Sequence, residues 1–350
     1  MLKIVEDQPF FEGNKHKEKL MRPFIYTKSE DTAQATSKVG ANENAKYLAG
    51  GTNLLDLMKE DVERPDELVD LGRLKLTDIK ETDKGVSLGA LAKNTETANH
   101  ALVRKNFPML SLAILAGASG QIRNMATNGG NPNQRTRCAY FFDTAMPCNK
   151  REPGTGCGAL EGHNHMHAIF GWNENCVAVH PSDMCIALVA LDATVTLADP
   201  NGKTRTIPFV DYHRLPGDQP EKDNNLERGE LITSIEIPNN NFAKNSYYVK
   251  VRDRSSYAFA LISVGAGLEL DGNIIKTARI AMGGVAHKPW RAYEAEKFLK
   301  GKEATEANFE AAADAEMANA KTLEHNAFKV PLGKQAMVRA LNVALSGEKV

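Results

Sequence analysis

The sequence predicts an α+β fold with two domains, and three observations support this class. Short strand-like and helical runs alternate over residues 22–91, which is typical of a small α/β subdomain. A hairpin signal and further strand-like runs occupy residues 194–270, and from Pro289 onward the composition is alanine-rich and helical. A chain of 350 residues is long enough to bury two separate cores.

Local patterns predict the elements of the first half of the chain. Residues 107–127 are expected to form a helix followed by a glycine-rich turn, and residues 132–175 have little periodicity of any kind. The other expected elements are strands at 22–26, 47–49, 67–70 and 86–90, and a helical turn at 53–58.

In the second half, Asp199-Pro200-Asn201-Gly202 lies between two alternating runs and predicts a hairpin. The run Pro238-Asn239-Asn240-Asn241 is a plausible domain boundary. The other expected elements are an apolar helix at 181–191, strands at 194–197, 204–207, 231–237, 247–251, 261–270 and 278–283, and helices from 289 to the end.

Composition excludes several classes of function. Lys and Arg number 43 against 44 Asp and Glu, so the basic excess that nucleic-acid binding requires is absent. No run of eighteen apolar residues is present, so membrane insertion is not expected. Residues 1–20 have no apolar signal segment and are expected to be an extension, which by itself predicts a cytoplasmic location.

The first motif with chemical meaning is Lys46-Tyr47-Leu48-Ala49-Gly50-Gly51-Thr52-Asn53-Leu54. Two glycines after a strand allow backbone N–H groups to approach a pyrophosphate, and Thr52 and Asn53 add side-chain donors. The motif departs from the G-x-G-x-x-G pattern of NAD-binding folds. A plain tight turn is the alternative interpretation.

The second motif runs from Gly117 to Asn131 and contains two glycine-rich loops around Ile122-Arg123-Asn124. Its small residues and hydrogen-bonding side chains suit a second backbone wall for a dinucleotide. A helix end followed by a turn is the alternative, which becomes weaker because two such segments occur in one chain.

Cysteines form the third motif. Cys138, Cys148, Cys157 and Cys176 are separated by nine, eight and eighteen residues, and four thiolates match either a [4Fe–4S] cluster or a tetrahedral zinc site. An irregular segment of this length needs something to hold it, which favours a metal site. Cys185 lies in an apolar helical run and is expected to be a core residue.

Histidines give weaker signals. His163, His165 and His167 would share one face of an extended strand, but no carboxylate partner accompanies them, so a metal site there is not expected. His180 and His287 are expected to form local hydrogen bonds.

These motifs resemble the FAD-binding subunits of the molybdenum hydroxylases. The resemblance rests on Gly50–Leu54, Ile122–Asn124, Ala126–Asn131 and Ser182-Asp183, and extends from about Met21 to Leu345. Within that family the chain is most similar to the FAD subunits of bacterial periplasmic aldehyde oxidoreductases. The stretches that carry this closer likeness are Thr136–Cys138, Pro147–Arg151, His180–Met184 and Val285–Arg291.

The resemblance implies a two-subdomain FAD-binding domain of the PCMH type at residues 21–238, with a cluster-bearing insertion at about 133–176. A smaller strand-and-helix domain of the carbon monoxide dehydrogenase flavoprotein type would follow at residues 245–346. FAD contacts would come from the 46–54 loop, Thr127, Gly130, Asn131, Gln134, Asp183 and Lys250. Lys250 would place positive charge near the flavin ring; a solvated strand lysine is the alternative.

The resemblance further implies that Cys138, Cys148, Cys157 and Cys176 bind a [4Fe–4S] cluster. Partners would be a small subunit with two [2Fe–2S] clusters and a large molybdopterin subunit, where aldehyde oxidation would occur. The flavin would pass the electrons to an external acceptor. Related complexes can be exported already folded, so a periplasmic location is compatible with a signal on a partner.

Two alternatives for the function stay open at this point. Within the same family, the chain would be the FAD subunit of a xanthine dehydrogenase or of an aryl-CoA reductase. In a different class, it would be an assembly or binding protein without flavin, whose four cysteines hold structural zinc.

Overall fold

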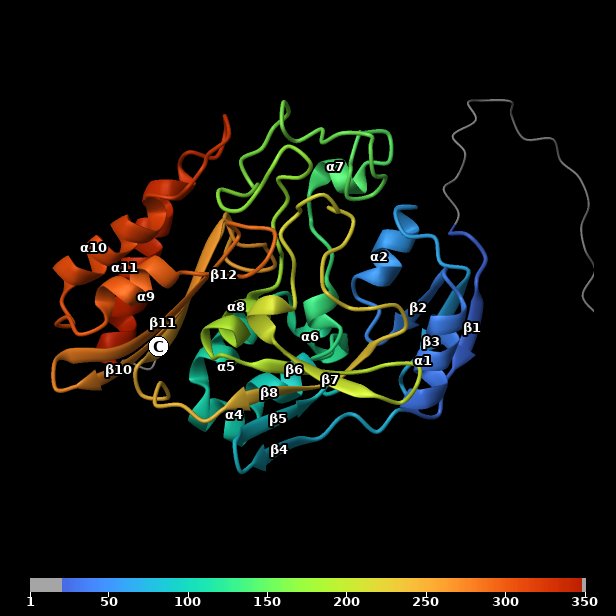
Figure 1. The fold of residues 1–350 in the computed structure, drawn as a ribbon, viewed down its shortest axis with the longest axis horizontal. Helices are drawn as coiled ribbons and strands as arrows, with labels where there is room; N and C mark the ends of the chain where they lie inside the picture. Colours follow the sequence, from blue (N-terminus) through green and yellow to red (C-terminus); the bar gives the residue numbers. More distant parts are fainter. Residues whose placement is uncertain (1–20, 348–350) are drawn as a thin grey trace, which may run out of the picture.

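The computed structural model describes residues 21–347, whose strands form three sheets (Figure 1). The first sheet is parallel, in the order β1 (Ile25–Lys28), β3 (Glu67–Asp70) and β2 (Ala45–Leu48). Parallel neighbours require crossover connections, and helices α1 (Thr32–Ala41) and α2 (Leu54–Lys59) lie in these connections. The alternation predicted for residues 22–91 is therefore confirmed.

The second sheet is antiparallel, in the order β4-β5-β8-β6-β7. The predicted hairpin is confirmed, since Thr194 pairs with Pro208 and Ala198 with Thr204. β4 was not predicted, because three of its four residues are exposed and give no apolar pattern. The strands are β4 (Ile79–Thr82), β5 (Gly85–Gly89), β6 (Thr194–Ala198), β7 (Thr204–Pro208) and β8 (Leu231–Pro238).

The helix predicted within residues 107–127 is in fact two helices, α5 (Pro108–Ala116) and α6 (Gly120–Met125). Ala118, between them, has a φ of 51°, a conformation that no α-helix contains. Ser119 then begins α6 by accepting a hydrogen bond from the N–H of Ile122. Two short helices, α3 (Asn94–Asn99) and α4 (Ala101–Asn106), precede them and were not predicted.

The third sheet is antiparallel and has the order β12-β11-β10-β9. The helical prediction from Pro289 is wrong at its start, because Trp290 and Arg291 pair with Met282 and Ala281 as strand β12. The strands are β9 (Ser246–Val251), β10 (Ile262–Asp271), β11 (Ile274–Gly283) and β12 (Trp290–Arg291); the helices are α9 (Tyr293–Leu299), α10 (Glu306–Met317) and α11 (Lys329–Ser346).

Two large hydrophobic cores hold the sheets. One packs the second sheet against α5 and the fully buried helix α8 (Asp183–Ala190). The other packs the third sheet against α9, α10 and α11. Because α5 and α8 also contact strands of the third sheet, that sheet is covered on both faces. Helix α8 therefore packs against both sheets and connects the two halves of the chain.

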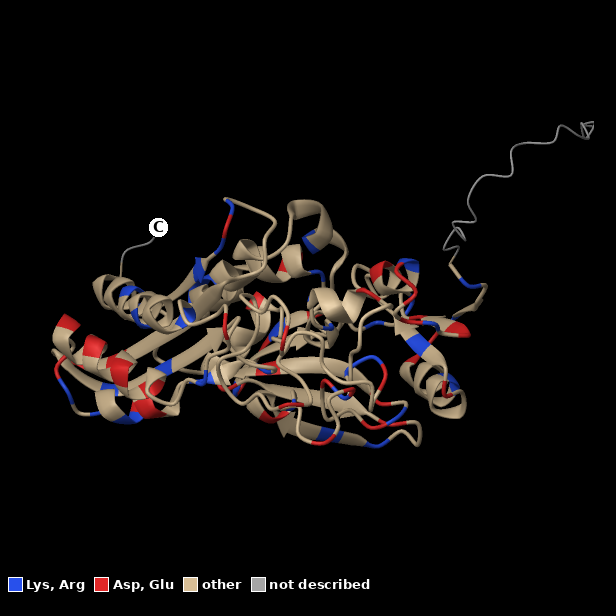
Figure 2. Cartoon of the chain, turned by 90° about the horizontal axis from the view of Figure 1, so that it is seen from above, with Lys and Arg blue, Asp and Glu red and all other residues tan. Residues whose placement is uncertain are grey.

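Residues 133–176 pass between the first and third sheets (green in Figure 1). Their only α-helix is α7 (Ala139–Phe142), and turns and bends dominate the remainder. Lys and Arg are interspersed with Asp and Glu along the described chain (Figure 2). No helix within residues 21–347 is long and apolar enough to cross a membrane. The extension predicted at residues 1–20 falls outside the described residues.

Candidate functional site

The glycine loop between β2 and α2 is pressed against the end of α6. A Cβ on Gly50 would lie 2.2 Å from the carbonyl oxygen of Met125, so only glycine fits there. Gly51 has a φ of 71°, which also favours glycine. The close approach brings residues 46–54 and 126–134 together as two walls of one cavity.

The second wall is ordered by its own hydrogen bonds. Thr127 is buried, and its Oγ1 accepts a hydrogen bond from the N–H of Gly130. Gln134 Nε2 donates to the carbonyl and side-chain oxygens of Asn131. A Cβ on Gly130 would lie 2.9 Å from Thr127 Oγ1, so a larger residue would disturb this turn.

The cavity between the walls has a volume of about 1220 Å³, above the range of pockets for drug-sized ligands and therefore suited to a dinucleotide. Arg214 also lines it, and the buried Nε of Arg214 has no hydrogen-bond partner within residues 21–347. This unpaired guanidinium N–H is suited to donate a hydrogen bond to an anionic ligand. Thirteen predicted FAD residues line this cavity: Lys46, Tyr47, Leu48, Ala49, Gly50, Gly51, Thr52, Asn53, Leu54, Thr127, Gly130, Asn131 and Gln134.

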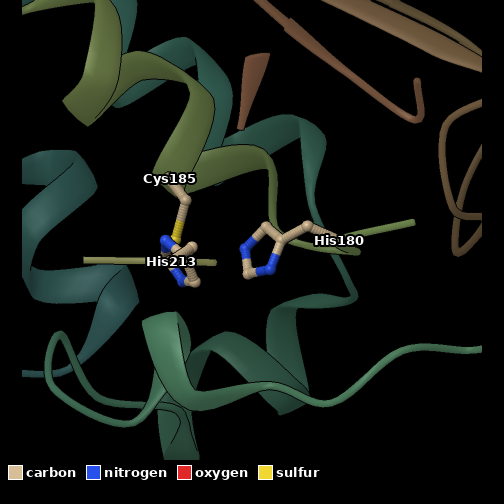
Figure 3. A group of neighbouring side chains, drawn as sticks. All are labelled: His180, Cys185 and His213. Carbon is tan, nitrogen blue, oxygen red and sulfur yellow. The ribbon is translucent and has the colours of Figure 1, made fainter. Parts of the chain in front are cut away.

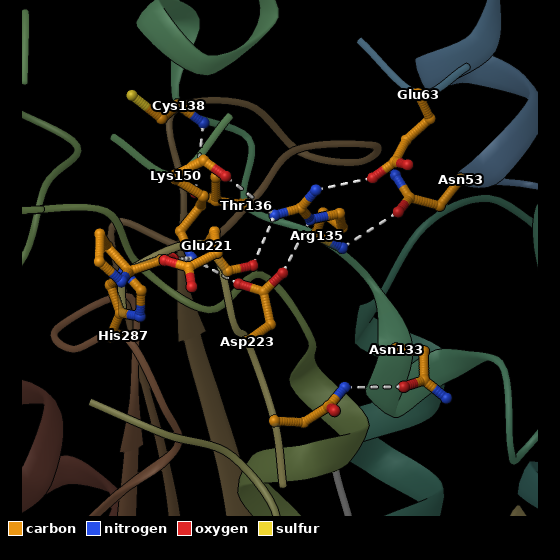
Figure 4. Close-up of polar contacts among 12 residues, drawn as sticks. Asn53, Glu63, Asn133, Arg135, Thr136, Cys138, Lys150, Glu221, Asp223 and His287 are labelled. Carbon is orange, nitrogen blue, oxygen red and sulfur yellow. Dashed lines mark hydrogen bonds and ion pairs between the residues drawn. The ribbon is translucent and has the colours of Figure 1, made fainter. Parts of the chain in front are cut away.

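Arg135 is a cavity residue that sequence reasoning missed, and it joins the glycine loop to the cysteine-rich segment (Figure 4). Its backbone N–H donates to Asn53 Oδ1 at 3.0 Å. Its guanidinium contacts Glu63 at 2.6 Å and Asp223 at 2.8 Å. These two carboxylates raise the pKa of Arg135 further, against the effect of burial. No local pattern marks this role, because its partners lie 72 and 88 residues away.

Lys150 is a buried member of the same ion-pair network. Its side chain is 1% exposed, and Nζ contacts Asp223 Oδ1 at 2.5 Å and the carbonyl of Pro220 at 2.7 Å. Lys150 and Arg135 hold the pKa of Asp223 well below its usual range, although burial alone would raise it. Asp223 therefore stays ionised and ties residues 218–225 to the cysteine-rich segment.

Asp183 and Lys250 do not line the large cavity. Lys250 Nζ lies 2.8 Å from Asp183 Oδ2, and both side chains are at least nine-tenths buried. Tyr248 donates to the other carboxylate oxygen of Asp183 at 2.6 Å. The solvated-lysine alternative is thus wrong, because Lys250 is a buried ion-pair partner. Its positive charge reaches the cavities only through Asp183.

Asp183 instead lines a second cavity of about 250 Å³, together with Cys138, His180 and Ser182. The two cavities adjoin, since Ser182 Oγ donates a hydrogen bond to Asn131 Oδ1 and Asn131 lines the larger one. An elongated ligand that occupied both cavities would contact all the residues predicted from the resemblance except Lys250.

The four cysteines of the third motif come together, and none is in a disulfide. Cys148 and Cys157 form an antiparallel β-bridge. Burial raises the pKa of Cys138 and of Cys176, and neighbouring thiols of the group add to both increases. A four-iron cluster spreads its thiolates over separate iron atoms, so they stand further apart than around one zinc ion. In the described chain, no three of these thiols lie within 4.8 Å of one another.

Hydrogen bonds hold the cysteine-rich loops in place. Asn149 Oδ1 accepts from the N–H groups of Gly154 and Gly156, which fixes the turn between Cys148 and Cys157. Arg151 donates to the carbonyls of Tyr140, Phe141 and Met146. Besides these polar contacts, a small apolar cluster that includes Phe141 and Cys148 helps to hold the loop.

The histidine predictions are compared with the structure one by one. The prediction of a local hydrogen bond is wrong for His287, whose Nε2 lies 3.2 Å from Sγ of Cys176, 111 residues away, and whose buried Nδ1 has no partner within residues 21–347. The prediction for His180 is also wrong for its ring, because the buried Nε2 has no partner within the described residues. His163, His165 and His167 lie in turns rather than in a strand, and His167 Nε2 lies 3.1 Å from Cys138 Sγ. Cys185 is fully buried in the core, as predicted.

The chain resembles known proteins over nearly all its length. Residues 21–240 match the family described as FAD binding domain in molybdopterin dehydrogenase, and residues 247–344 match the CO dehydrogenase flavoprotein C-terminal domain. The aldehyde oxidoreductase FAD-binding subunit PaoB of Escherichia coli is 46% identical, over 92% of this chain and 98% of that protein. The glyceraldehyde dehydrogenase medium chain of Sulfolobus acidocaldarius is 30% identical, over 80% and 82%.

Solved structures show the same fold. A carbon monoxide dehydrogenase chain from Hydrogenophaga pseudoflava matches with a TM-score of 0.74 at 25% identity, over 94% of this chain and 100% of that one. A quinoline 2-oxidoreductase chain from Pseudomonas putida 86 gives 0.73 at 23% identity, over 94% and 99%, which shows the fold alone.

Proposed function

We propose a function from the premise that this chain belongs to the FAD-binding family of the molybdopterin dehydrogenases. The chain is an electron-transfer subunit that binds one FAD and one [4Fe–4S] cluster. It passes electrons from the iron–sulfur clusters of a partner to an external acceptor. The observation that carries the proposal is the Asn53–Arg135 contact, which places the cysteine-rich segment directly against the glycine loop.

The FAD binds across the two adjoining cavities. The pyrophosphate lies against the backbone of residues 50–53, where glycine permits close approach. The second wall, from Thr127 to Gln134, borders the ribityl chain and phosphates. Asp183, held by Tyr248 and Lys250, presents a fixed carboxylate in the smaller cavity toward the flavin end. Lys250 acts through that carboxylate.

Cys138, Cys148, Cys157 and Cys176 bind the cluster. Their thiols are free of disulfides, and hydrogen bonds fix the loops that carry them. Cys138 also lines the smaller cavity beside Asp183, so the cluster and the flavin are neighbours. Such a neighbour supplies single electrons to a flavin, which accepts them singly and releases them singly or in pairs.

The partners we propose are a small subunit with two [2Fe–2S] clusters and a large molybdopterin subunit. Aldehyde oxidation takes place on the large subunit, as the name of the Escherichia coli relative suggests. The domain division that we propose is 21–238 and 245–346, supported by the family matches at 21–240 and 247–344.

The cofactors are tested first on the full chain purified without oxygen. We expect one FAD and about four irons per chain, with a [4Fe–4S] signal in electron paramagnetic resonance after reduction. Cys148→Ser should lose the iron, whereas Cys185→Ser, a cysteine outside the group, should keep it. FAD without iron would overturn the cluster, and stoichiometric zinc without FAD would support the assembly-protein alternative.

The substrate class is tested on the complex that a tagged chain retains from its own cells. An aldehyde should bleach the flavin absorption under anaerobic conditions, because electrons from the large subunit reach the FAD. Bleaching by xanthine, with no response to aldehydes, would instead support the xanthine dehydrogenase alternative. A response to aryl-CoA alone would indicate the reductase.

A further inference from the structure

A second group of potential metal ligands lies in the core and includes none of the four cysteines of the cluster. His180, Cys185 and His213 each place a ligand atom within 4.8 Å of the other two, and all three residues are buried. The Cys185 thiol is directed toward the His213 ring, and the His180 ring lies beside it (Figure 3). The rings of His180 and His213 are 4.2 Å apart.

The hydrogen bonds of these histidines leave ring nitrogens unused. His213 Nε2 lies 2.8 Å from the carbonyl of Pro132, which can only accept, so Nε2 carries the proton. His213 Nδ1 is then a bare lone pair, and it has no partner within residues 21–347. His180 Nε2 is also buried without a partner there. Two unpaired ring nitrogens beside one thiol are costly unless an ion occupies the space.

His213 already has the second contact typical of a metal-bound histidine. Metal-ligating imidazoles usually donate their other N–H to a carbonyl or carboxylate, which fixes the ring and its tautomer. The bond from Nε2 to Pro132 is of this kind and leaves Nδ1 without a hydrogen-bond partner in the described chain. Tyr212 packs against the same ring at 4.8 Å, edge to face, so the ring has little freedom to turn.

The number of ligands and their total charge indicate which ion would fit this group. Structural zinc takes four ligands, but no fourth His, Cys, Asp or Glu of the described chain joins this group. One thiolate and two neutral imidazoles balance a single positive charge, so a monovalent ion would leave no net charge in the core. Soft sulfur and imidazole ligands suit copper(I), which is monovalent.

We propose that His180, Cys185 and His213 bind one copper(I) ion in the core beneath the FAD-binding walls. Binding replaces the thiol proton of Cys185, which leaves to solvent, and no electron is transferred. The ion links α8 to the segment after β7, and through Pro132 it also fixes the turn at residues 131–134. It thus stabilises one wall of the large cavity from behind.

The test uses the full chain, already loaded with FAD and iron and handled anaerobically. Copper(I) is added in competition with a chromophoric copper(I) chelator, and bound copper, zinc and iron are counted after desalting. We expect one retained copper per chain with no loss of iron. Cys185→Ser and His180→Gln should each weaken copper binding at least 100-fold.

Met184→Leu is the matched control, because Met184 is a buried sulfur residue adjacent to Cys185 on α8. It should retain copper as the wild type does. X-ray absorption at the copper edge should show one sulfur and two nitrogen ligands. The His180→Gln variant decides the test if Cys185→Ser does not retain FAD.

Equal copper retention in the wild type and both variants would overturn the proposal. So would copper bound by more than one sulfur, or copper bound only as iron is displaced, since either places it at the other cysteines. Tighter retention of zinc than of copper(I) would overturn the choice of ion.

Discussion

The glycine loop at residues 46–54 and the cysteine-rich segment at residues 133–176 lie against each other but are held in different ways. The glycine loop follows a strand and is fixed by backbone shape, with Gly50 packed onto the carbonyl of Met125. The cysteine-rich segment has one short helix and is fixed by charged side chains such as Arg135 and Lys150. Local geometry therefore maintains one wall of the site, and long-range polar contacts maintain the other.

The largest effect is expected where the polar contacts are most buried. Lys150→Met removes a cation that pairs with Asp223 from a position 1% exposed. We expect a loss of about 4 kcal/mol in the free energy of unfolding, since breaking a buried pair leaves a charge poorly compensated. Urea denaturation measures this loss. Lys222→Met, an exposed neighbour, is the control and should change stability by less than about 0.5 kcal/mol.

Gly50→Ala tests the wall that depends on backbone shape. The added Cβ would lie 2.2 Å from the Met125 carbonyl oxygen, so the two walls would have to separate. We expect a loss of about 3 kcal/mol and little retained FAD, because overpacking distorts the loop. Gly120→Ala, where a Cβ meets nothing within 4 Å, is the matched control. Normal FAD content in Gly50→Ala would contradict the proposed pyrophosphate site.

Lys329 anchors the cysteine-rich segment to α11 and makes stability depend on pH. Its Nζ donates to the carbonyls of His167 and Gly284, and burial lowers its pKa to about 7. The unfolded chain has a lysine pKa near ~10.4, so between pH 7 and pH 10 only the unfolded state keeps the proton. Stability should therefore rise with pH across this window and be lowest below it.

We expect that rise to be about 3 kcal/mol for the wild type, measured by urea denaturation across the window. Lys329→Met should flatten it, because no buried amine remains to titrate. Lys334→Met, a more exposed lysine of α11, should preserve the rise. A wild-type profile no steeper than that of Lys329→Met would show that Lys329 stays charged in the folded state.

The smallest effect is expected at the hydrogen bond that joins the two regions. Asn53→Ala removes the acceptor for the N–H of Arg135 but leaves the ion pairs of Arg135 intact. We expect about 1 kcal/mol, or roughly fivefold weaker FAD binding, from one lost neutral hydrogen bond. Flavin fluorescence titration of the apoprotein measures it. An effect as large as that of Gly50→Ala would mean that the Asn53 side chain contributes more to FAD binding through the cofactor than through Arg135.

Local sequence determined the elements whose pattern repeats within a few residues. The hairpin around Asp199-Pro200-Asn201-Gly202, strand β3 and helix α8 all appear where periodicity and turn residues placed them. The glycine loop was recognised for the same reason, since two glycines after a strand limit the backbone to a few shapes. The grouping of four cysteines followed from the resemblance to a family rather than from spacing.

Tertiary structure alone decided the remainder. Arg135 and Lys150 meet Asp223 across more than seventy residues, and no local pattern encodes such a contact. The break between α5 and α6, at Ala118 with its positive φ, was likewise hidden in a run that reads as helical. The unpaired nitrogens of His180 and His213 emerge only when burial removes water as a partner. Short-range periodicity fixes elements, whereas burial and pairing of polar groups depend on the folded chain as a whole.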